Sequence, residues 1–425
     1  MAARQRVMAS MRHHAAVAGF IEIGTPALEY AETLLGQGGG DTDKEVYRFK
    51  DHGERDVALR FDLTVPFARY VAENQGTMVF PFKRLQIGDV WRGENPQKGR
   101  YREFCQADLD IIGSESLSSD VEILTTLAGV LHDLDVGNFT ITIGHRPILT
   151  ALIQLLLPGS HEGGVLIAID KLAKIGREKT LGLIAAAAPQ CPPDACARLL
   201  DLISPAGAEG ETNLDAVISV FGANAGAVST HVSRLRETLQ LARELISSSR
   251  IRLRVDLTLA RGLGYYTGIV FEMTHDELRG FGSIGGGGRY DGLVSRFSTR
   301  SLGGVGGSIG IDRLTAGLEE LSRLWQAPAV QVFVVLATPD VRSYGLQLAS
   351  RLRRAGFATD VALNDGVGKI ASQFRHADRL GARLVVTVGT SELAAMTYAL
   401  REMASGDERR DLPAAGLEKE IARLL

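Results

Sequence analysis

The polar and apolar positions of residues 82–113 form the most informative pattern in the chain. Two alternating runs flank a charged segment that contains Pro and Gly, which predicts two antiparallel strands joined by a long loop. Because side chains two apart share one face of a strand, one face of the second run is expected to carry Arg102, Phe104, Gln106, Asp108 and Asp110. A core face would not combine a cation, an aromatic ring, an amide and two carboxylates. The hairpin is therefore interpreted as a platform for a charged small molecule, the alternative being a solvated hairpin.

Hydrophobic periodicity predicts elements along the rest of the chain. The expected helices are 3–18, 65–74, 120–134, 311–325, 341–355 and 369–380. The expected strands are 45–49, 57–61, 139–143, 251–259, 269–273, 302–309, 330–337, 357–363 and 383–389.

The same pattern divides the chain into four segments. Residues 1–144 and 251–327 mix strands and helices, whereas residues 145–250 are rich in Ala, Leu and Ser and read as an inserted helical region. Residues 328–425 alternate as β-α-β-α-β with β-branched strands, which indicates a small α/β domain with parallel pairing.

Composition narrows the class of protein. A chain of 425 residues with 45% hydrophobic content is expected to form two or three domains. The net charge of −3 gives no whole-protein field that favours nucleic acid, so a polynucleotide would have to meet a local basic patch. Three cysteines, with the spacing CPPDAC, make neither a disulfide framework nor a zinc pattern, and a reducing cytoplasm is expected. The first 20 residues resemble neither a signal peptide nor a membrane span.

Three further segments carry candidate chemistry. Arg60, Asp62 and Thr64 lie on one face if ALRFDLT is a strand, although Asp62 has the alternative of capping a helix that begins at residues 64–65. RGLGYYTGIVFE (residues 261–272) places a cation and two tyrosines at a turn, where the tyrosines have the alternative of being core residues. GGSIGIDR places a cation just inside a helix. None of these is a phosphate loop of the GxxxxGK type.

Taken together, these segments resemble the histidine-specific class II aminoacyl-tRNA synthetases over nearly the whole chain. WRGENPQKGRYREF resembles motif 2, GGVGGSIGIDRL resembles motif 3, and GFIEIGTPALEY resembles motif 1 of the dimer interface. RGLGYYTGIVFE with GGGGRYDGL resembles the histidine-specific signature, and LRFDLTVPFARY is a further matching block. The resemblance implies an α+β catalytic domain with an antiparallel sheet and flanking helices, a helical insertion, and a C-terminal α/β domain like the family's anticodon-binding domain.

The family's reaction supplies the expected partners. It implies that ATP, accompanied by Mg²⁺, activates histidine to histidyl-adenylate, that the histidyl group passes to histidine tRNA, and that the protein is a homodimer through residues 19–30. Fixed cations are needed because two anions must meet in the reaction.

The resemblance also assigns roles to single residues. The catalytic pair is Arg92, which bridges the amino-acid carboxylate and the α-phosphate, and Arg261 on the α-phosphate. Other ATP contacts are Arg100 at the terminal phosphates, Glu94 at the adenine amino edge, and Phe104 and Arg313 on either side of adenine. The expected histidine contacts are Asp62, Thr64 and Gln106 for the α-ammonium group, and Asp110 and Tyr266, with Tyr265 beside it, for the imidazole.

Two departures from the family pattern and two other functions remain. Gly264 stands where the family usually has an acidic residue, and the family's short lead segment is missing ahead of Met1. One alternative is a non-catalytic paralogue that senses histidine, similar to the regulatory subunit of ATP phosphoribosyltransferase. Such paralogues typically lack the terminal domain and parts of the histidine signature. The other alternative is a nucleotide- or RNA-binding module without chemistry.

Overall fold

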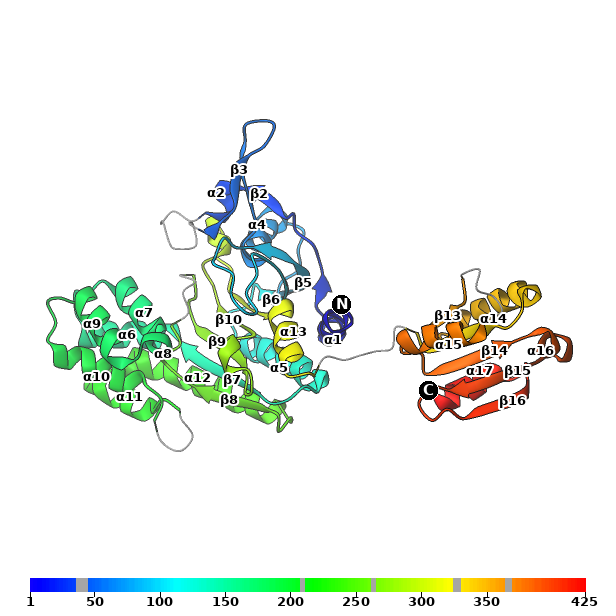
Figure 1. The fold of residues 1–425 in the computed structure, drawn as a ribbon. Helices are drawn as coiled ribbons and strands as arrows, with labels where there is room; N and C mark the ends of the chain where they lie inside the picture. Colours follow the sequence, from blue (N-terminus) through cyan, green and yellow to red (C-terminus); the bar gives the residue numbers. More distant parts are fainter. Residues whose placement is uncertain (36–44, 207–210, 261–264, 324–329, 364–368) are drawn as a thin grey trace. The chain divides into compact units, whose positions relative to one another are not determined.

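The computed structural model describes residues 1–35, 45–206, 211–260, 265–323, 330–363 and 369–425. The chain divides into two compact units, Met1–Leu324 and Trp325–Leu425 (Figure 1).

An eight-stranded sheet forms the centre of the first unit. Its order is β1-β5-β6-β11-β10-β9-β7-β8. The strands are β1 (Ile21–Glu22), β5 (Phe82–Trp91), β6 (Glu103–Ile112), β7 (Phe139–His145), β8 (Ile251–Val255), β9 (Ile269–His275), β10 (Gly285–Arg289) and β11 (Gly304–Gly310). The predicted antiparallel sheet is confirmed from β5 through to β7, but both edge strands, β1 and β8, pair in parallel.

Three helices cover one face of this sheet. They are α1 (Ala2–Val17), α5 (Leu117–Leu134) and α13 (Ile311–Glu320). On β6 the alternate residues Cys105, Ala107 and Leu109 are buried toward this side. The polar residues of β6 occupy the alternate positions and point to the opposite face of the sheet. The alternation that predicted the hairpin therefore also separates its apolar face from its polar face.

A smaller layer carries residues 28–74. It contains a three-stranded sheet in the order β2-β4-β3 and two helices. Their bounds are β2 (Leu28–Tyr30), α2 (Ala31–Leu34), β3 (Arg48–Lys50), β4 (Asp56–Leu59) and α4 (Thr64–Asn74). Two strand predictions were too long here. The strand expected at 45–49 is shifted to Arg48–Lys50, and the one expected at 57–61 ends at Leu59.

The early end of β4 has a physical cause. The backbone N–H of Val65 donates to the Asp62 carboxylate at 3.0 Å, so Asp62 satisfies one of the free N–H groups at the start of α4. The expectation that Arg60, Asp62 and Thr64 share a strand face is therefore wrong, because only the segment before Arg60 is extended and Thr64 already begins the helix.

Along the chain, a set of helices follows β7 and precedes β8. They are α6 (Arg146–Leu156), α7 (Glu162–Asp170), α8 (Leu172–Ile175), α9 (Arg177–Ala187), α10 (Pro193–Ile203), α11 (Leu214–Phe221) and α12 (Gly226–Leu245), with the 3₁₀ turn η1 (Gly222–Asn224). Figure 1 shows them gathered at one side of the large sheet. Two short 3₁₀ turns, η2 (Arg279–Phe281) and η3 (Val294–Arg296), complete the first unit.

The second unit is a five-stranded sheet with helices. Its elements are β12 (Val332–Leu336), η4 (Pro339–Val341), α14 (Arg342–Arg354), β13 (Thr359–Val361), α15 (Ile370–Arg379), β14 (Leu384–Val388), α16 (Thr390–Ala395), β15 (Thr397–Glu402), β16 (Glu408–Pro413) and α17 (Leu417–Leu424). Strands β13, β12 and β14 pair in parallel, as the β-α-β-α-β pattern predicted. The pattern missed β15 and β16, which extend the sheet in antiparallel fashion.

Candidate active site

One cleft of about 390 Å³ opens on the polar face of the large sheet. Its lining includes Asp62, Thr64, Arg92, Glu94, Arg100, Phe104, Gln106, Asp110, Tyr265, Tyr266 and Arg313. These residues come from both halves of the sheet and from the start of α4, so the fold brings together side chains that are more than 200 positions apart. Arg261 and Gly264 lie outside the described residues.

Strand β6 forms the floor of the cleft between β5 and β11. Gln106, Asp108 and Asp110 each stand in register with one residue of β5 and one of β11. Asp110 faces Gly306, where an added Cβ would lie 2.0 Å from the Asp110 Oδ1 atom. Only glycine leaves room for the carboxylate at this position.

A buried ion pair anchors one end of the floor. The Nη2 atom of Arg84 lies 2.8 Å from the Oδ2 atom of Asp110, and neither side chain is more than 3% exposed. Arg84 also donates to the backbone oxygen of Leu63 at 3.0 Å, and its guanidinium carbon lies 4.5 Å from the centroid of the Phe67 ring. Burial raises the pKa of Asp110, while the charge of Arg84 opposes that shift.

Asp62 serves two purposes. Its Oδ1 atom caps α4, whereas its Oδ2 atom is buried without a hydrogen-bond partner among the described residues. Burial raises the pKa of this carboxyl, and Arg92 and Arg84 lower it. The helix-cap interpretation is correct, and the same carboxyl also lines the cleft.

The tyrosines form an aromatic wall beside Asp110. The rings of Tyr265 and Tyr266 are 4.9 Å apart, and those of Tyr265 and Tyr290 are 6.1 Å apart. Tyr266 belongs to a hydrophobic cluster, as the core interpretation expected, yet Tyr265 and Tyr266 both line the cleft. The Tyr290 hydroxyl donates to Asp110 Oδ1, and burial raises the pKa of Tyr290 well above its usual value.

The other end of the cleft is cationic. Arg92 donates from Nε to the backbone oxygen of Phe61 at 3.0 Å, and its guanidinium carbon lies 5.2 Å from the centroid of the Phe104 ring. Arg100 pairs with Glu94 at 3.1 Å. Guanidinium groups bind phosphate oxygens and stack on aromatic faces, so this end suits a polyanion that carries an aromatic base.

Arg313 is held at the same end by backbone oxygens. It donates from Nε to Gly99 at 3.2 Å and from Nη1 to Ser283 at 2.9 Å. These contacts join the start of α13 to the loop between β5 and β6 and to the segment before β10, so Arg313 is fixed beside the hairpin loop.

Sequence reasoning gave no role to several residues that line this cleft. Among them are Asp108, Glu272 and Tyr290. Asp108 was placed on the correct face but given no role, and Tyr290 follows directly after the glycine run of β10. The shared parity of Asp108 with Gln106 and Asp110 was the signal that could have identified it.

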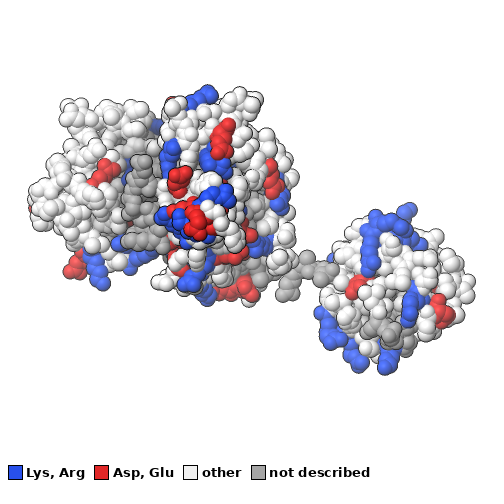
Figure 2. All heavy atoms as spheres, turned by 90° about the horizontal axis from the view of Figure 1, so that it is seen from above, with Lys and Arg blue, Asp and Glu red and all other residues white. Residues whose placement is uncertain are grey.

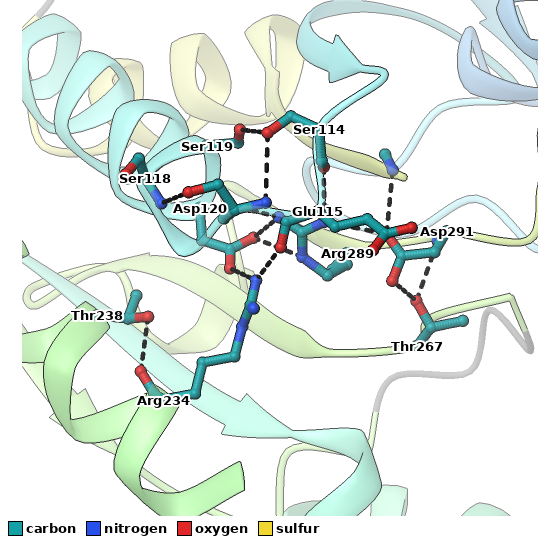
Figure 3. A network of polar contacts seen from close by, with 12 residues as sticks. Ser114, Glu115, Ser118, Ser119, Asp120, Arg234, Thr238, Thr267, Arg289 and Asp291 are labelled. Carbon is teal, nitrogen blue, oxygen red and sulfur yellow. Dashed lines mark hydrogen bonds and ion pairs between the residues drawn. The ribbon is translucent and has the colours of Figure 1, made fainter. Parts of the chain in front are cut away.

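A network of charged side chains includes Asp120, Arg234 and Arg289 (Figure 3). Arg289, the residue before Tyr290, donates to Asp120 Oδ1 from Nε at 2.9 Å and from Nη2 at 2.6 Å. Asp120 Oδ2 accepts from Arg234 of α12 at 3.2 Å, and Arg234 also donates to the backbone oxygen of Glu115 at 2.7 Å. Asp120 of α5 therefore connects the inserted helices with β10, the strand that ends at Arg289.

Arg289 also fixes the start of the following loop. Its Nη1 atom donates to the backbone oxygen of Ser114 and to Asp291, each at 3.0 Å. The second oxygen of Asp291 accepts from the Thr267 hydroxyl at 2.8 Å, which Figure 3 also shows. A single guanidinium group therefore connects three segments around the tyrosine wall.

Within the described ranges, no group of three or more His, Cys, Asp or Glu side chains is arranged to hold a metal ion. Among the same residues, no helix has both the length and the apolar character that crossing a membrane requires.

The chain is similar to known proteins over most of its length. Residues 1–314 match the family profile for histidyl-tRNA synthetase, and residues 331–424 match that for an anticodon binding domain. The chain is 39% identical over 412 residues to a histidine–tRNA ligase of Rhodopirellula baltica, covering 96% of this chain and 91% of that one. It is 41% identical over 401 residues to a histidine–tRNA ligase of Helicobacter pylori, covering 91% and 87%.

Solved structures show the same likeness. The histidyl-tRNA synthetase of Nostoc sp. PCC 7120 superposes with a TM-score of 0.85 at 30% identity, over 99% of this chain and 95% of that one. The fold and the cleft define a class II aminoacyl-tRNA synthetase. Within that class, the match over residues 1–314 and the identities of about 40% show that the chain belongs to the histidyl-tRNA synthetase family.

Proposed function

We propose that this protein uses ATP to activate histidine as histidyl-adenylate and then transfers the histidyl group to histidine tRNA. The observation that carries the proposal is a single cleft with an acidic and aromatic end at Asp110 and a cationic end at Arg92 and Arg100. An amino acid with a polar ring and a nucleoside triphosphate fit these two ends side by side.

The cationic end supports the chemistry of activation. The histidine carboxylate attacks the α-phosphorus of ATP, and pyrophosphate leaves. Arg92 lies beside Phe104 in the cleft, where it contacts both the carboxylate and the α-phosphate and reduces the repulsion between them. Arg100 holds the terminal phosphates, Glu94 accepts from the adenine amino group, and Phe104 and Arg313 lie on either side of adenine. Arg261 is assigned to the α-phosphate by resemblance alone.

The acidic end supports selection of histidine. Asp62, Thr64 and Gln106 accept from the α-ammonium group, whereas Asp110 and Tyr266 face the two imidazole nitrogens, with Tyr265 beside them. Amino acids with apolar side chains are rejected because the buried groups of the site would lose their partners.

Mg²⁺ enters this scheme with ATP. Bound to the nucleotide, it would neutralise part of the charge of the phosphate groups. We treat it as part of the nucleotide substrate.

We assign a separate role to each of the four segments of the chain. We place the catalytic parts at residues 1–144 and 251–327, the helical insertion at 145–250 and an anticodon-binding role at 328–425. The second unit contains 13 Lys and Arg and 11 Asp and Glu, so it is net positive although the whole chain is net negative. Helix α14 contains four arginines and no acidic residue. Figure 2 shows several basic side chains on the surface of this unit, which supports contact with a polyanion.

The segment that resembles motif 1 supports a homodimer. Ile21 is 57% exposed and Tyr30 is 50% exposed, and both lie in residues 19–30. We propose that a second copy of the chain covers this apolar surface. Ile21→Glu should shift the molar mass measured by light scattering from dimer to monomer, whereas Leu183→Glu, at a similarly exposed position on α9, should leave it unchanged.

Histidine-dependent ATP–pyrophosphate exchange tests the main proposal. The synthetase requires exchange that depends on histidine, followed by charging of histidine tRNA. Histidine binding without exchange would identify a sensor instead, and absence of both would leave only a binding module. Tyr266→Phe should raise the KM for histidine, and unchanged selectivity would contradict the assignment of the imidazole pocket.

A further inference from the structure

Asp108 lies at the centre of the cleft floor without an assigned role. It stands on β6 between Gln86 of β5 and Ser308 of β11, and it is 5% exposed. Its Oδ1 atom has no hydrogen-bond partner among the described residues. A carboxylate oxygen buried in this way is costly unless a donor arrives.

Two other acceptor atoms in the same cleft are also buried without a partner in the described structure. They are Asp62 Oδ2 and Gln106 Oε1. A primary ammonium group carries one positive charge and three N–H donors. The three acceptors therefore match the three donors of such a group in number.

The cations nearest to Asp108 are already engaged. Arg84 forms the ion pair with Asp110. Arg60 donates to the backbone oxygens of Asp89 at 2.9 Å and Thr25 at 2.6 Å. Among the described residues, two further carboxyls, Asp62 and Asp110, also act on Asp108.

Burial and the neighbouring charged groups determine the pKa of Asp108. Burial raises its pKa to about 7, and the charges of Asp110 and Asp62 add to the shift, whereas Arg84 and the Ser308 hydroxyl oppose it. Near neutral pH the carboxyl is then partly protonated in the empty cleft.

We propose that Asp108 receives the α-ammonium group of histidine and releases its own proton to solvent when that group binds. The proposal rests on the proposed function and adds a specificity-determining residue to it. The proton leaves the carboxyl oxygen for the buffer, the ammonium group keeps its three protons, and an ammonium–carboxylate pair replaces a neutral carboxyl. The carboxyl of Asp108 is thereby fully ionised only when the amino acid is bound.

Titration calorimetry of the full-length protein tests this linkage. Histidine is titrated near pH 7 in phosphate and in Tris, whose different ionisation enthalpies report protons released. We expect release of about half a proton from Asp108, which falls toward zero at a pH about one unit higher, where the carboxyl is largely ionised and the α-ammonium group of histidine is still protonated. 3-(Imidazol-4-yl)propionate, which lacks the ammonium group, should bind without this release.

Asp108→Asn supplies the second arm. It should abolish the release and weaken histidine binding about 10- to 100-fold, while it leaves binding of the propionate analogue unchanged. The control Asp201→Asn removes an exposed carboxylate of α10 and should behave as the wild type. Equal proton release in Asp108→Asn, or equal weakening of both ligands, would overturn the proposal.

The outcomes separate this inference from the function on which it rests. Absence of histidine-dependent exchange in the wild type would overturn the proposed function. Exchange with no ammonium-dependent proton release would overturn only the role of Asp108. If Asp108→Asn does not fold, the comparison of histidine with the propionate analogue in the wild type still decides.

Discussion

The guanidinium group of Arg84 and the carboxylate of Asp110 face each other across two paired strands, 2.8 Å apart and closed off from solvent. The residue that faces the imidazole in our assignment is therefore held by a cation that does not itself line the cleft. This pair affects both stability and specificity, because without Arg84 the buried carboxyl of Asp110 would take up a proton.

Arg84→Met should destabilise the first unit by about 3–5 kcal/mol, because it leaves Asp110 buried without its counter-charge. The free energy of unfolding from urea titration, followed by a probe in the first unit, measures the effect. Arg48→Met is the matched control, since its ion pair with Asp56 lies at the surface and its loss should change little. Equal effects of the two substitutions would contradict the structural role of Arg84.

Arg289→Lys should raise the KM for histidine about tenfold with little change in the KM for ATP, because Lys does not reproduce the fork that holds Asp120 and Asp291. We expect the effect to pass through Tyr290. Steady-state exchange kinetics with each substrate varied in turn measure it.

Arg234→Ala provides a graded comparison in the same network. Its side chain is 33% exposed and its bond to Asp120 is 3.2 Å long, so its loss should have a smaller effect in the same direction. A larger effect than that of Arg289→Lys would place the control of Tyr290 in the inserted helices.

Arg92→Ala should lower the rate of exchange about a hundredfold or more, since it removes a charge from the reacting phosphate. Arg313→Ala should instead raise the KM for ATP about fivefold, because a stacking contact is worth about 1 kcal/mol. Single-turnover adenylate formation separates the two effects. The assignment of these residues would fail if Arg313→Ala lowered the rate of the chemical step as strongly as Arg92→Ala.

His145 should make the protein sensitive to acid. Its side chain is 3% exposed, and burial lowers its pKa from 6.5 to about 3, with the nearby His231 and Arg234 adding to the shift. The unfolded chain binds this proton at a higher pH than the folded chain. The free energy of unfolding therefore decreases as the pH falls from about 6.5 toward 3, by up to about 5 kcal/mol.

The pH dependence of the unfolding free energy checks this expectation. His145→Gln should show a flatter decline in that range than the wild type, whereas His13→Gln, at an exposed position of α1, should decline in parallel with the wild type. A parallel decline of His145→Gln would exclude His145 as the source.

Removal of the residues after Pro328 should spare adenylate formation and impair charging of histidine tRNA. The first unit holds the whole described cleft, and the second unit has its own core. Exchange and charging assays on residues 1–328 and on the full chain measure the two steps. Equal charging by both would remove the anticodon-binding role.

Alternation along the sequence predicted the hairpin and its working face, because a strand has a strict period of two. It did not predict that Arg84 is buried, since an arginine in an alternating run normally faces water, and only the pairing with Asp110 reverses this. Tyr290 was missed for a related reason. Its bond to Asp110 links residues 180 positions apart, which no local pattern reports.

Propensity failed where side chains competed with the backbone. The run before Asp62 looks like a strand, but a capping bond to Val65 ends it early. In the second unit, β16 reads ERRDLP and is almost wholly exposed, so it lacks the apolar alternation that marks a strand and is defined by its pairing with β15. Elements of this kind are visible only after their neighbours are in place.

The position of β6, with hydrogen-bonded neighbours on either side, has a consequence for attempts to alter which amino acid the protein accepts. Its backbone amides should be among the slowest in the chain to exchange with deuterium. Loop grafting will not reshape such a floor, and new selectivity would have to come from side chains that fit beside Gly306 and its neighbouring strands.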